Sequence, residues 1–555
     1  MAVCLVGLSL GLTTCNPPLE GSLACPGGAQ DCEPTSSDGS VRPKQPPAGP
    51  ERIERAGPGS RTPFDPSADG SSGVKLDPGG NVVLDPGHFM GHNTPIIWVA
   101  NSAEGTISKV DSRNMKEVAR YVTFPGGGAD PSRTSVSLDG DVVVANRARP
   151  DGHKASAVKI AGSKAACVDR NRNGRIDTFE GEGPVPPQFQ WAAGQRESPD
   201  ECVLWLTDLS EGATSTLPRA AGFDATVGDN GMLSAKVYIG LYNKRQLVRL
   251  NARTGAIEKR IDVSPVHPYG LVIDRDGNVW IVDIGGPMAK VDVRNGDRVT
   301  TLTGDKETPC PYGIAADPKG FIYTAGRNCI ARLNPMTLTW ERLNVPNASS
   351  LRGVAVDQNY GVWAADTNRG MVHVDASAAT MVYKNLISVG GGNVGAAIDF
   401  DGFPWVISQG QSRAFKIHPG TYQVQSVAVG NGPYTYSDMT GFQLRNAAAP
   451  TGLFRQTFSG CGGNTQWVTL DFKVTAPSGT QVVVRVRAAQ TRADLAAAPW
   501  THLASIPPDM PSLPLPLRIS GPQEYLQVEF ALRSSDSQLT PILSSVSAGY
   551  NCPLG

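Results

Sequence analysis

Charge is scarce in this chain of 555 residues, and neither sign is in excess. Asp, Glu, Lys and Arg make up 18% of the sequence, against about 25% in an average soluble protein. The 50 basic and 51 acidic residues leave a formal net charge of −1. Because no basic excess is available to neutralise phosphates, the composition argues against nucleic acid as the main partner.

Long apolar runs, histidines and familiar catalytic motifs are equally scarce. Beyond the first 15 residues no stretch approaches about 18 consecutive apolar residues, so we expect no transmembrane helix. The seven histidines are scattered and CxxC does not occur, which argues against a zinc site. After residue 15 the GxSxG, HExxH and P-loop motifs are also missing, so that part of the sequence carries none of these three catalytic or nucleotide-binding signatures.

Glycine and proline are abundant instead, with 62 and 44 residues, which indicates a turn-rich chain and not a helical bundle. Internal repetition begins near residue 96. The clearest copies are PYGLVIDRDGNVWIVD, PYGIAADPKGFIYTAG, LRGVAVDQNYGVWAAD and VGAAIDFDGFPWVIS. Each copy predicts a strand, a tight Asp-x-x-Gly turn and a second strand with a bulky aromatic residue, followed by two further strands.

The spacing of the second-strand residues counts the copies. These anchors are Trp98, Val143, Tyr238, Trp280, Tyr323, Trp363 and Trp405. Successive intervals are about 42 residues, except for one of 95 that holds an insertion at about 161–215. Seven four-stranded units of this length predict an all-β fold, a seven-bladed β-propeller. PYTYSDMTGFQL from Pro433 is expected to supply the inner strand of blade one, with VKLDPGGNVVL from Val74 as the competing segment.

The stretch 264–430 resembles bacterial propellers of the NHL and streptogramin-lyase type, through its repeated run Gly–apolar–Asp-x-x-Gly-x-Val-Trp. The resemblance implies the propeller fold. In streptogramin lyases a set of His and Glu residues around a magnesium ion performs an elimination. Here His267 has no second histidine in the matching blades, and Asp, Gly and Ser replace the strand-end glutamates. The sequence therefore favours a binding protein over an enzyme, and a lyase if it is an enzyme.

Four regions follow from composition and pattern. Residues 1–15 resemble a signal peptide ending in a lipobox, Leu-Thr-Thr-Cys, which would make Cys15 a lipid-anchored first residue. Residues 16–73 are rich in Pro, Gly and Ser and predict a disordered tether. The propeller is assigned to 74–446. Alternating strands in 447–555 predict a β-sandwich similar to galactose-binding-like or jelly-roll modules.

The remaining eight cysteines support export to an oxidising compartment. They allow 105 pairings, but they fall into four local couples along the chain. The couples are Cys25 with Cys32, Cys167 with Cys202, Cys310 with Cys329, and Cys461 with Cys552. The expected location is the outer membrane or cell surface, with the periplasm or secretion as alternatives, and with the lipid as the membrane contact.

A calcium loop is predicted inside the insertion, in CVDRNRNGRIDTFEGEG. Its residues match an EF-hand-like loop at positions 1, 3, 5, 7, 9 and 12, namely Asp169, Asn171, Asn173, Arg175 (through its carbonyl), Asp177 and Glu180. An Asn/Asp/Gly-rich turn that binds nothing is the alternative. Clear flanking helices are missing, so a structural calcium ion is expected and not a calcium sensor.

Any catalytic or binding site is expected at the mouth of the propeller channel. Residues three after each anchor would ring that mouth: Asn101, Asn146, Leu241, Asp283, Gly326, Asp366 and Ser408. His267, Tyr269, Tyr312 and Arg352 precede or begin first strands and would approach the same opening. The weak catalytic candidates are His267, Arg352, Asp283 and Asp366.

Three functions remain open on the sequence. The first is a lipid-anchored surface protein that binds a protein or polysaccharide and holds one structural calcium. The second is a propeller enzyme, a lyase or lactonase, with a metal held by Asp283 and Asp366. The third is a protein directed to a polysaccharide by its sandwich.

Overall fold

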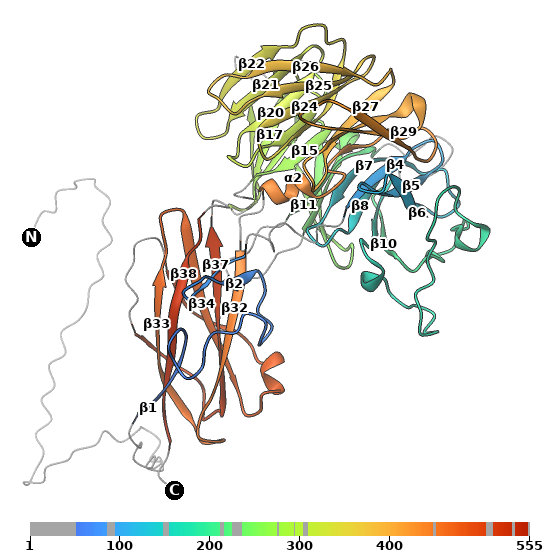
Figure 1. Ribbon diagram of the computed structural model, residues 1–555. Helices are drawn as coiled ribbons and strands as arrows, with labels where there is room; N and C mark the ends of the chain where they lie inside the picture. Colours follow the sequence, from blue (N-terminus) through green and yellow to red (C-terminus); the bar gives the residue numbers. More distant parts are fainter. Residues whose placement is uncertain are drawn as a thin grey trace, which may run out of the picture. The chain divides into compact units, whose positions relative to one another are not determined.

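The computed structural model describes residues 51–85, 95–147, 155–210, 216–224, 236–274, 277–293, 295–302, 309–447, 451–506, 514–534 and 539–552. Strands dominate these residues and build two all-β parts, a propeller and a sandwich (Figure 1). The two parts are considered separately. None of the helices in this part of the chain is long and apolar enough to cross a membrane.

Seven sheets follow one another along the propeller sequence. Blade 1 holds β4 (Ile96–Asn101), β5 (Thr106–Asp111) and β6 (Lys116–Val122), and blade 2 holds β7 (Asp130–Val136), β8 (Val142–Arg147), β9 (Ser156–Ile160) and β10 (Val203–Asp208). Blade 3 holds β11 (Pro218–Asp224), β12 (Lys236–Leu241), β13 (Gln246–Asn251) and β14 (Ile257–Asp262), and blade 4 holds β15 (Gly270–Ile273), β16 (Val279–Val282), β17 (Met288–Asp292) and β18 (Arg298–Leu302).

The last three blades are built in the same way. Blade 5 holds β19 (Gly313–Ala316), β20 (Ile322–Gly326), β21 (Cys329–Asn334) and β22 (Thr339–Asn344), and blade 6 holds β23 (Leu351–Val356), β24 (Gly361–Asp366), β25 (Gly370–Asp375) and β26 (Val382–Ser388). Blade 7 holds β27 (Asn393–Ile398), β28 (Pro404–Ser408), β29 (Arg413–Ile417) and β30 (Val424–Ala428). The predicted all-β, seven-bladed architecture is confirmed.

One repeated hydrogen bond explains the spacing between the Asp of each turn and the aromatic anchor six residues later. In blade 6, Asp357 Oδ1 accepts the backbone N–H of Gly361 at 2.9 Å, and Asp357 Oδ2 accepts the Trp363 indole N–H at 2.8 Å. The same pair recurs as Asp274–Trp280, Asp317–Tyr323 and Asp399–Trp405. All seven anchors are at most 1% exposed, so their predicted place in the core is confirmed.

Each copy has a glycine near its start, and in blades 5 and 6 crowding near the channel requires it. A Cβ on Gly313 in β19 would overlap the carbonyl oxygen of Arg352 in β23. A Cβ on Gly353 would lie 2.7 Å from the amide nitrogen of Ala396 in β27, closer than real Cβ contacts allow. The inner strands of neighbouring blades therefore pack backbone against backbone, which only glycine permits at these positions.

The ring is closed by the segment after Pro433, as predicted. Tyr434 N–H donates to the Ala100 carbonyl at 3.0 Å, and Trp98 N–H donates to the Met439 carbonyl at 2.9 Å, both on β4 of blade 1. Between these two bonds, β31 (Tyr436–Ser437) pairs in parallel with β7 of blade 2. The closing segment thus joins two blades, whereas the sequence predicted a contact with blade 1 alone. The competing segment at Val74 lies in the sandwich.

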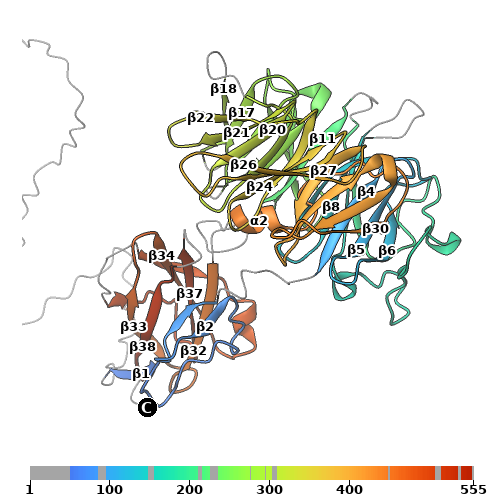
Figure 2. The same cartoon turned by 45° about the horizontal axis from the view of Figure 1, so that its top comes forward.

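A short helix follows the closing segment. This helix, α2 (Phe442–Ala447), lies against the inner strands β15, β19 and β27 (Figures 1 and 2). Thr440 Oγ1 donates to the carbonyl of Ile398, the last residue of β27, at 2.6 Å. The helix therefore lies toward the ends of the inner strands and leaves their beginnings free for the site described below.

The sandwich combines strands from both ends of the described chain. One sheet contains β1 (Arg52–Ala56), β2 (Val74–Leu76), β3 (Val82–Leu84), β33 (Gln466–Thr475), β36 (Leu515–Pro516) and β38 (Ile542–Asn551). The other has the order β32 (Thr451–Ser459), β37 (Tyr525–Ser534), β34 (Thr480–Ala489) and β35 (Thr501–Ile506). Both ribbon views show the blue β1 and β2 among the orange and red strands (Figures 1 and 2). The propeller is therefore an insertion between β3 and β32.

Two boundaries predicted from the sequence are wrong for this reason. Residues 51–73 were assigned to a tether, yet β1 pairs antiparallel with β38, with Arg52 opposite Tyr550. Residues 74–85 were assigned to the propeller, yet Val82 lies opposite Leu543 of β38. The low average hydrophobicity of 16–73 predicted disorder, although a few apolar residues in this segment pack in the sandwich core. Phe64 is 4% exposed and packs edge-on against Phe454, with ring centroids 5.0 Å apart.

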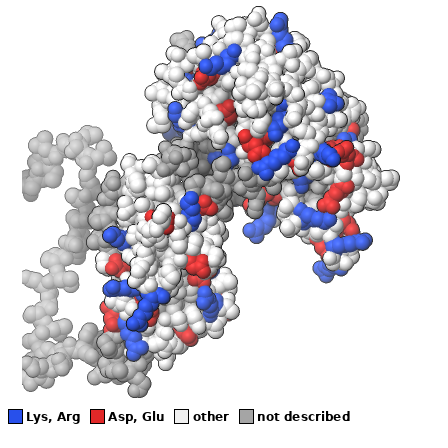
Figure 3. Space-filling model, in the orientation of Figure 1, with Lys and Arg blue, Asp and Glu red and all other residues white. Residues whose placement is uncertain are grey.

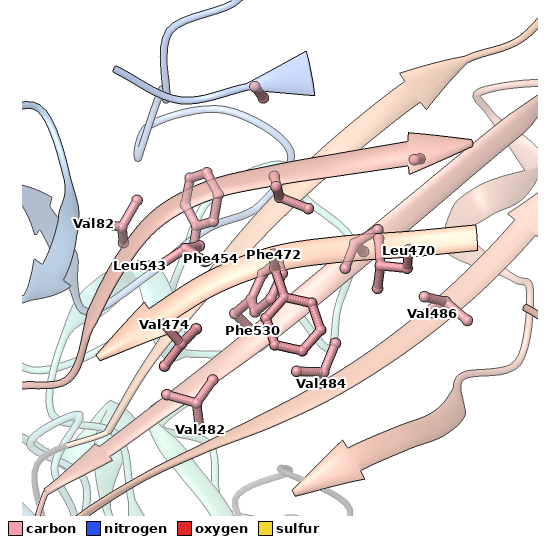
Figure 4. Packing of buried hydrophobic residues seen from close by; sticks show 14 of the residues in the cluster. Val82, Phe454, Leu470, Phe472, Val474, Val482, Val484, Val486, Phe530 and Leu543 are labelled. Atoms are coloured by element: carbon pink, nitrogen blue, oxygen red, sulfur yellow. The ribbon is translucent and has the colours of Figure 1, made fainter. Parts of the chain in front are cut away.

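The sandwich core lies between the inward faces of its two sheets (Figure 4). Figure 4 shows Phe472 and Phe530 from opposite sheets side by side, and their ring centroids are 5.4 Å apart. Leu526, Val528, Phe530 and Leu532 are all fully buried, as the alternation of β37 predicted.

Three of the four expected cysteine couples are disulfides in the structure: Cys167–Cys202, Cys310–Cys329 and Cys461–Cys552. Cys25 and Cys32 lie outside the described residues, as do Cys15, the signal segment and residues 16–50 of the expected tether. Three disulfides indicate an oxidising, extracytoplasmic location.

Candidate functional site

One end of the propeller channel gathers arginine and tyrosine side chains. The inner strands begin at this end and the second strands finish there, as when Gly270 pairs with Val282. Tyr269, Tyr312 and Arg352, expected at the opening, lie there. We define the mouth cluster as Arg133, Arg147, Arg219, Arg352, Tyr269, Tyr312, Tyr434 and Tyr436.

Arg133 forms the floor of the mouth cluster. It is 2% exposed, and its guanidinium carbon lies 4.4 Å from the ring centroid of Tyr269 and 4.0 Å from that of Tyr436. Its Nε donates to the backbone carbonyls of Arg219 at 2.5 Å and of Tyr269 at 3.2 Å. Its Nη1 has no hydrogen-bond partner within the described part of the chain.

Three further arginines form the rim. Arg147 pairs with Asp130 at 2.5 Å and lies 4.6 Å from the Tyr434 ring centroid. Arg219 lies 5.2 Å from the Tyr269 ring, and its Nε and Nη1 have no hydrogen-bond partner among the residues described. Arg352 Nη1 donates to the Tyr436 hydroxyl at 3.2 Å. The Nε of Arg147 also lacks a partner among the described residues. Because buried donors are normally satisfied, Arg147 and Arg219 retain capacity for an added acceptor.

The four phenol groups are linked to one another. The Tyr269 hydroxyl donates to the Tyr312 hydroxyl at 2.5 Å, and it lies 3.3 Å from the Tyr434 hydroxyl. The Tyr312 hydroxyl is 3.2 Å from that of Tyr436. A continuous chain of hydrogen bonds therefore crosses the mouth from Tyr434 to Tyr436 and on to Arg352.

Positive charge is in excess at this site. Four guanidinium groups face one paired carboxylate, that of Asp130, within the residues that the structure describes. Elsewhere, on the face drawn in Figure 3, basic and acidic side chains are interspersed over both parts. The mouth cluster is thus a local departure from a chain whose net charge is −1.

The pKa values of the tyrosines report this excess. Burial alone would raise the pKa of Tyr434, but Arg133, a hydrogen bond with Tyr269 and Arg219 together lower it to about 6. Burial raises the pKa of Tyr269, Tyr312 and Tyr436 above the usual value. The cluster therefore stabilises negative charge on one of its four phenols.

His267 and Asp283 form a hydrogen-bonded pair beside the mouth cluster. Asp283 Oδ2 accepts the backbone N–H of His267 and lies 3.0 Å from its Nδ1. Arg245 Nε donates to His267 Nε2 at 3.1 Å, and the Tyr242 ring lies 5.0 Å from the imidazole. The His267 side chain is 31% exposed and Asp283 is 7% exposed, so the imidazole is oriented by the carboxylate and open to solvent on one side.

Asp366 does not join this group. It is fully buried, and its carboxylate accepts backbone N–H groups of Ser349 at 2.6 Å and Asn368 at 3.0 Å. Burial alone would raise the pKa of this carboxyl group, but the hydrogen bonds outweigh burial and lower the pKa. The predicted ring of residues three after each anchor is buried as a whole: its members are at most 5% exposed or, for Gly326, classed as buried. The mouth is lined instead by residues at or near the beginnings of inner strands, by Arg147 at the end of β8, and by Tyr434 and Tyr436 of the closing segment.

The expected calcium loop is partly assembled. Asp169 accepts the backbone N–H of Gly174 at 2.9 Å, and the side-chain amides of Asn171 and Asn173 each donate to Asp177 at 2.8 Å. Arg175 pairs with Asp177 at 3.1 Å. Glu180, expected at position 12, is 63% exposed and lies 3.3 Å from Lys164.

A different carboxylate holds the calcium loop together. Glu201, which is 3% exposed, accepts the backbone N–H groups of Arg170 at 2.7 Å and Asp177 at 2.8 Å. Across the described residues no group of three or more His, Cys, Asp and Glu side chains is placed to hold a metal. The side chains at positions 1, 3, 5 and 9 are hydrogen-bonded within the loop itself, and the residue at position 12 lies apart from them.

Sequence reasoning missed Arg133, Arg147, Arg219, Tyr434 and Tyr436. The three arginines lie in blades 2 and 3, where the repeat is weakest, and so had no register to place them. The two tyrosines were visible in the closing segment, but only as a strand. A signal was available in principle, because alternation in PYTYSDM places both tyrosines on one face.

No protein-family model matches the chain, and no curated protein has a matching sequence. Similar solved structures include a catalytically inactive virginiamycin B lyase from Staphylococcus aureus with quinupristin, which is 11% identical over 60% of this chain and 87% of its own, with a TM-score of 0.39. A streptogramin B lyase is 13% identical over 57% and 88%, with a TM-score of 0.38. Apo AztD from Citrobacter koseri is 10% identical over 61% and 96%, with a TM-score of 0.40.

Proposed function

We propose that this is an extracytoplasmic binding protein whose mouth cluster takes an anionic ligand. A lipid on Cys15 would anchor it at the outer membrane or cell surface. The observation that supports anion binding is that, among the described residues, four guanidinium groups face one carboxylate, and three of the arginines have nitrogens without a hydrogen-bond partner. Leaving buried charge uncompensated is costly, and a carboxylate, sulfate or phosphate group would supply the missing acceptors.

The proposal predicts anion binding that depends on the rim arginines. Sulfate, phosphate and acetate, titrated separately by calorimetry at low ionic strength, test it directly. Replacing both Arg147 and Arg219 by Gln is expected to weaken binding at least about tenfold, because a hydrogen bond to a charged group contributes about 1.5–3 kcal/mol. Arg253, an exposed arginine away from the mouth, provides the matched control Arg253→Gln. Absence of binding by all three anions, or an equal loss in the control, contradicts the proposal.

The His267–Asp283 pair supports a second candidate function, an acid–base enzyme of the lyase or lactonase class. A carboxylate on Nδ1 holds a histidine in the tautomer whose Nε2 carries the lone pair. In His267 that lone pair accepts the Arg245 Nε–H, so Arg245 must move aside before Nε2 can take a proton. Asp366 is no metal ligand in this arrangement, because backbone N–H groups occupy its carboxylate. Hydrolysis of an aromatic lactone such as dihydrocoumarin, abolished by His267→Gln, would favour this function. A wild-type rate equal to the buffer rate removes the lactonase version of it.

We also propose that the loop from Asp169 to Asp177 binds one structural calcium ion. The loop matches the calcium motif at these positions, and the carboxylates of Asp169 and Asp177 already accept hydrogen bonds from within the turn. Because Glu180 lies outside the set, the affinity is expected to be modest, in the range of about 10⁻⁴–10⁻³ M that extracellular modules show. Calorimetry should detect one equivalent in the wild type and none in Asp169→Ala. Glu180→Ala should keep the site, and loss of binding in that variant would instead restore position 12 as a ligand.

A further inference from the structure

Tyr434 occupies a special place in the mouth cluster. Its backbone is fixed to blade 1 by the bond to Ala100, while its side chain is only partly buried. The charged groups near Tyr434 come from four elements: Arg133 from β7, Arg147 from β8 with its partner Asp130 from β7, Arg219 from β11 and Arg352 from β23. Its titratable neighbours are Tyr269, Tyr312 and Tyr436, which are joined in the hydrogen-bond chain.

We infer that Tyr434 is the internal counter-ion of the mouth cluster, and that a ligand oxyanion takes over its arginine contacts while the phenolate takes up a proton. The inference rests on the proposed function and identifies how the same site is regulated. The exchange balances: the phenolate oxygen gains one proton from solvent, no other bond changes, and a monoanionic ligand leaves the net charge of the cluster unchanged. The ligand group is an oxyanion of the carboxylate, sulfate or phosphate type.

Geometry favours Tyr434 over the other three phenols for this role. Tyr269 and Tyr436 are 1% and 2% exposed and stack on the floor arginine, Arg133. The Tyr312 hydroxyl already meets those of Tyr269 and Tyr436. Tyr434 lies at the end of the phenol chain, beside the two rim arginines whose Nε donors are unused. Its phenolate and an incoming oxyanion therefore compete for the same guanidinium groups.

The first test needs no ligand. A pH titration of the near-ultraviolet phenolate absorbance of the free protein is expected to show one group ionising near pH 6, which is the pKa of Tyr434, and Tyr434→Phe should remove it. Between about pH 6 and the unfolded value of about 10, the unfolded chain binds the extra proton, so stability should rise with pH in the wild type and not in Tyr434→Phe. A wild type without this ionisation overturns the inference.

The second test measures proton uptake on binding. Sulfate, phosphate and acetate are titrated at about pH 8 in two buffers of different ionisation enthalpy. The wild type should take up about one proton per anion bound, and Tyr434→Phe about none. At about pH 8, two pH units above the pKa of Tyr434, only about 1% of the wild-type protein has this phenol protonated and its arginines free for the anion. Tyr434→Phe should therefore bind the anion roughly 100-fold more tightly than the wild type at about pH 8, and equally tightly at about pH 5.

Tyr242, whose ring lies 6.1 Å from that of Tyr269, provides the matched control, because Tyr242→Phe removes a phenol outside the mouth cluster and should leave proton uptake unchanged. Binding without proton uptake in the wild type overturns the inference and leaves the proposed function standing. Binding by none of the anions, with the phenolate present in the free protein, overturns the proposed function instead. The three anions separate carboxylate, sulfate and phosphate preferences.

Discussion

Replacement of Trp363 by Ala is expected to lower the free energy of unfolding of the propeller by about 3–5 kcal/mol. The Trp363 ring is fully buried, stacks on His373 with centroids 3.9 Å apart, and donates its indole N–H to Asp357 at 2.8 Å. The substitution removes a large apolar surface and leaves a buried carboxylate oxygen short of one donor. Thermal and denaturant unfolding, followed by circular dichroism, measure the effect.

Asp366→Ala supplies an informative comparison. The sequence placed Asp366 at an open mouth, where its loss would hardly affect stability, but the structure makes it a buried acceptor of several backbone N–H groups. Its removal should therefore cost about 1–3 kcal/mol. The half-exposed Val382 lies outside the aromatic register and provides the control. In Val382→Ala the free energy of unfolding is expected to stay within about 0.5 kcal/mol of the wild-type value. A Trp363→Ala protein as stable as that control would refute the blade register.

Replacement of Phe64 by Ala is the second change expected to have a large effect, about 3–5 kcal/mol, and it should act on the sandwich alone. Phe64 belongs to the N-terminal segment, yet it packs in the sandwich core against Phe454. Deleting residues 51–85 should go further and leave the sandwich unfolded, because β38 would lose its β1 and β3 partners. Limited proteolysis with mass spectrometry locates the unfolded part.

The same segment supplies the control. Ile53 in β1 is 55% exposed, so Ile53→Ala should change stability by no more than about 0.5 kcal/mol. Equal protease resistance of residues 451–552 in the wild type and the deletion protein would contradict the assignment of 51–85 to the sandwich. Cleavage that begins within the propeller would contradict it as well.

The predictable parts of the fold are those encoded by residues close together in the sequence, within one hairpin or one strand. The Asp-to-aromatic spacing in blades 4 to 7 encodes a hydrogen bond within one hairpin, so it can be read without knowing the rest of the molecule. The alternation in β37 likewise identifies its apolar core face, Leu526 to Leu532, although Gln527 and Glu529 on the opposite face are buried too. The pairing of β1 with β38 joins residues almost 500 apart, and no local pattern in RIERA identifies such a partner.

The site was predictable to the same extent. Tyr269, Tyr312 and Arg352 share a repeat position, so the register of the blades placed them at the mouth. Arg133 lies on β7, where the closing segment pairs with that strand and places the Tyr436 ring against the Arg133 guanidinium group. No local pattern in the sequence of β7 indicates this pairing. Glu180 is a residue that the sequence motif selected but that the structure places elsewhere. It lies beside Lys164, and Glu201 is the carboxylate that hydrogen-bonds to the loop.

The insertion of the propeller into the sandwich determines how mechanical force would travel through the protein. If the chain is held at its N-terminus, tension from a ligand on the propeller enters the sandwich through β3 and β32 and leaves through β1. A pull along β1 shears its ladder with β38, so that the hydrogen bonds from Arg52 to Ala56 resist together and do not open one at a time. The Cys461–Cys552 disulfide ties the end of β38 covalently to the segment before β33. If the predicted lipid on Cys15 anchors the chain, the sandwich would act as a tension-resistant joint between that anchor and the propeller.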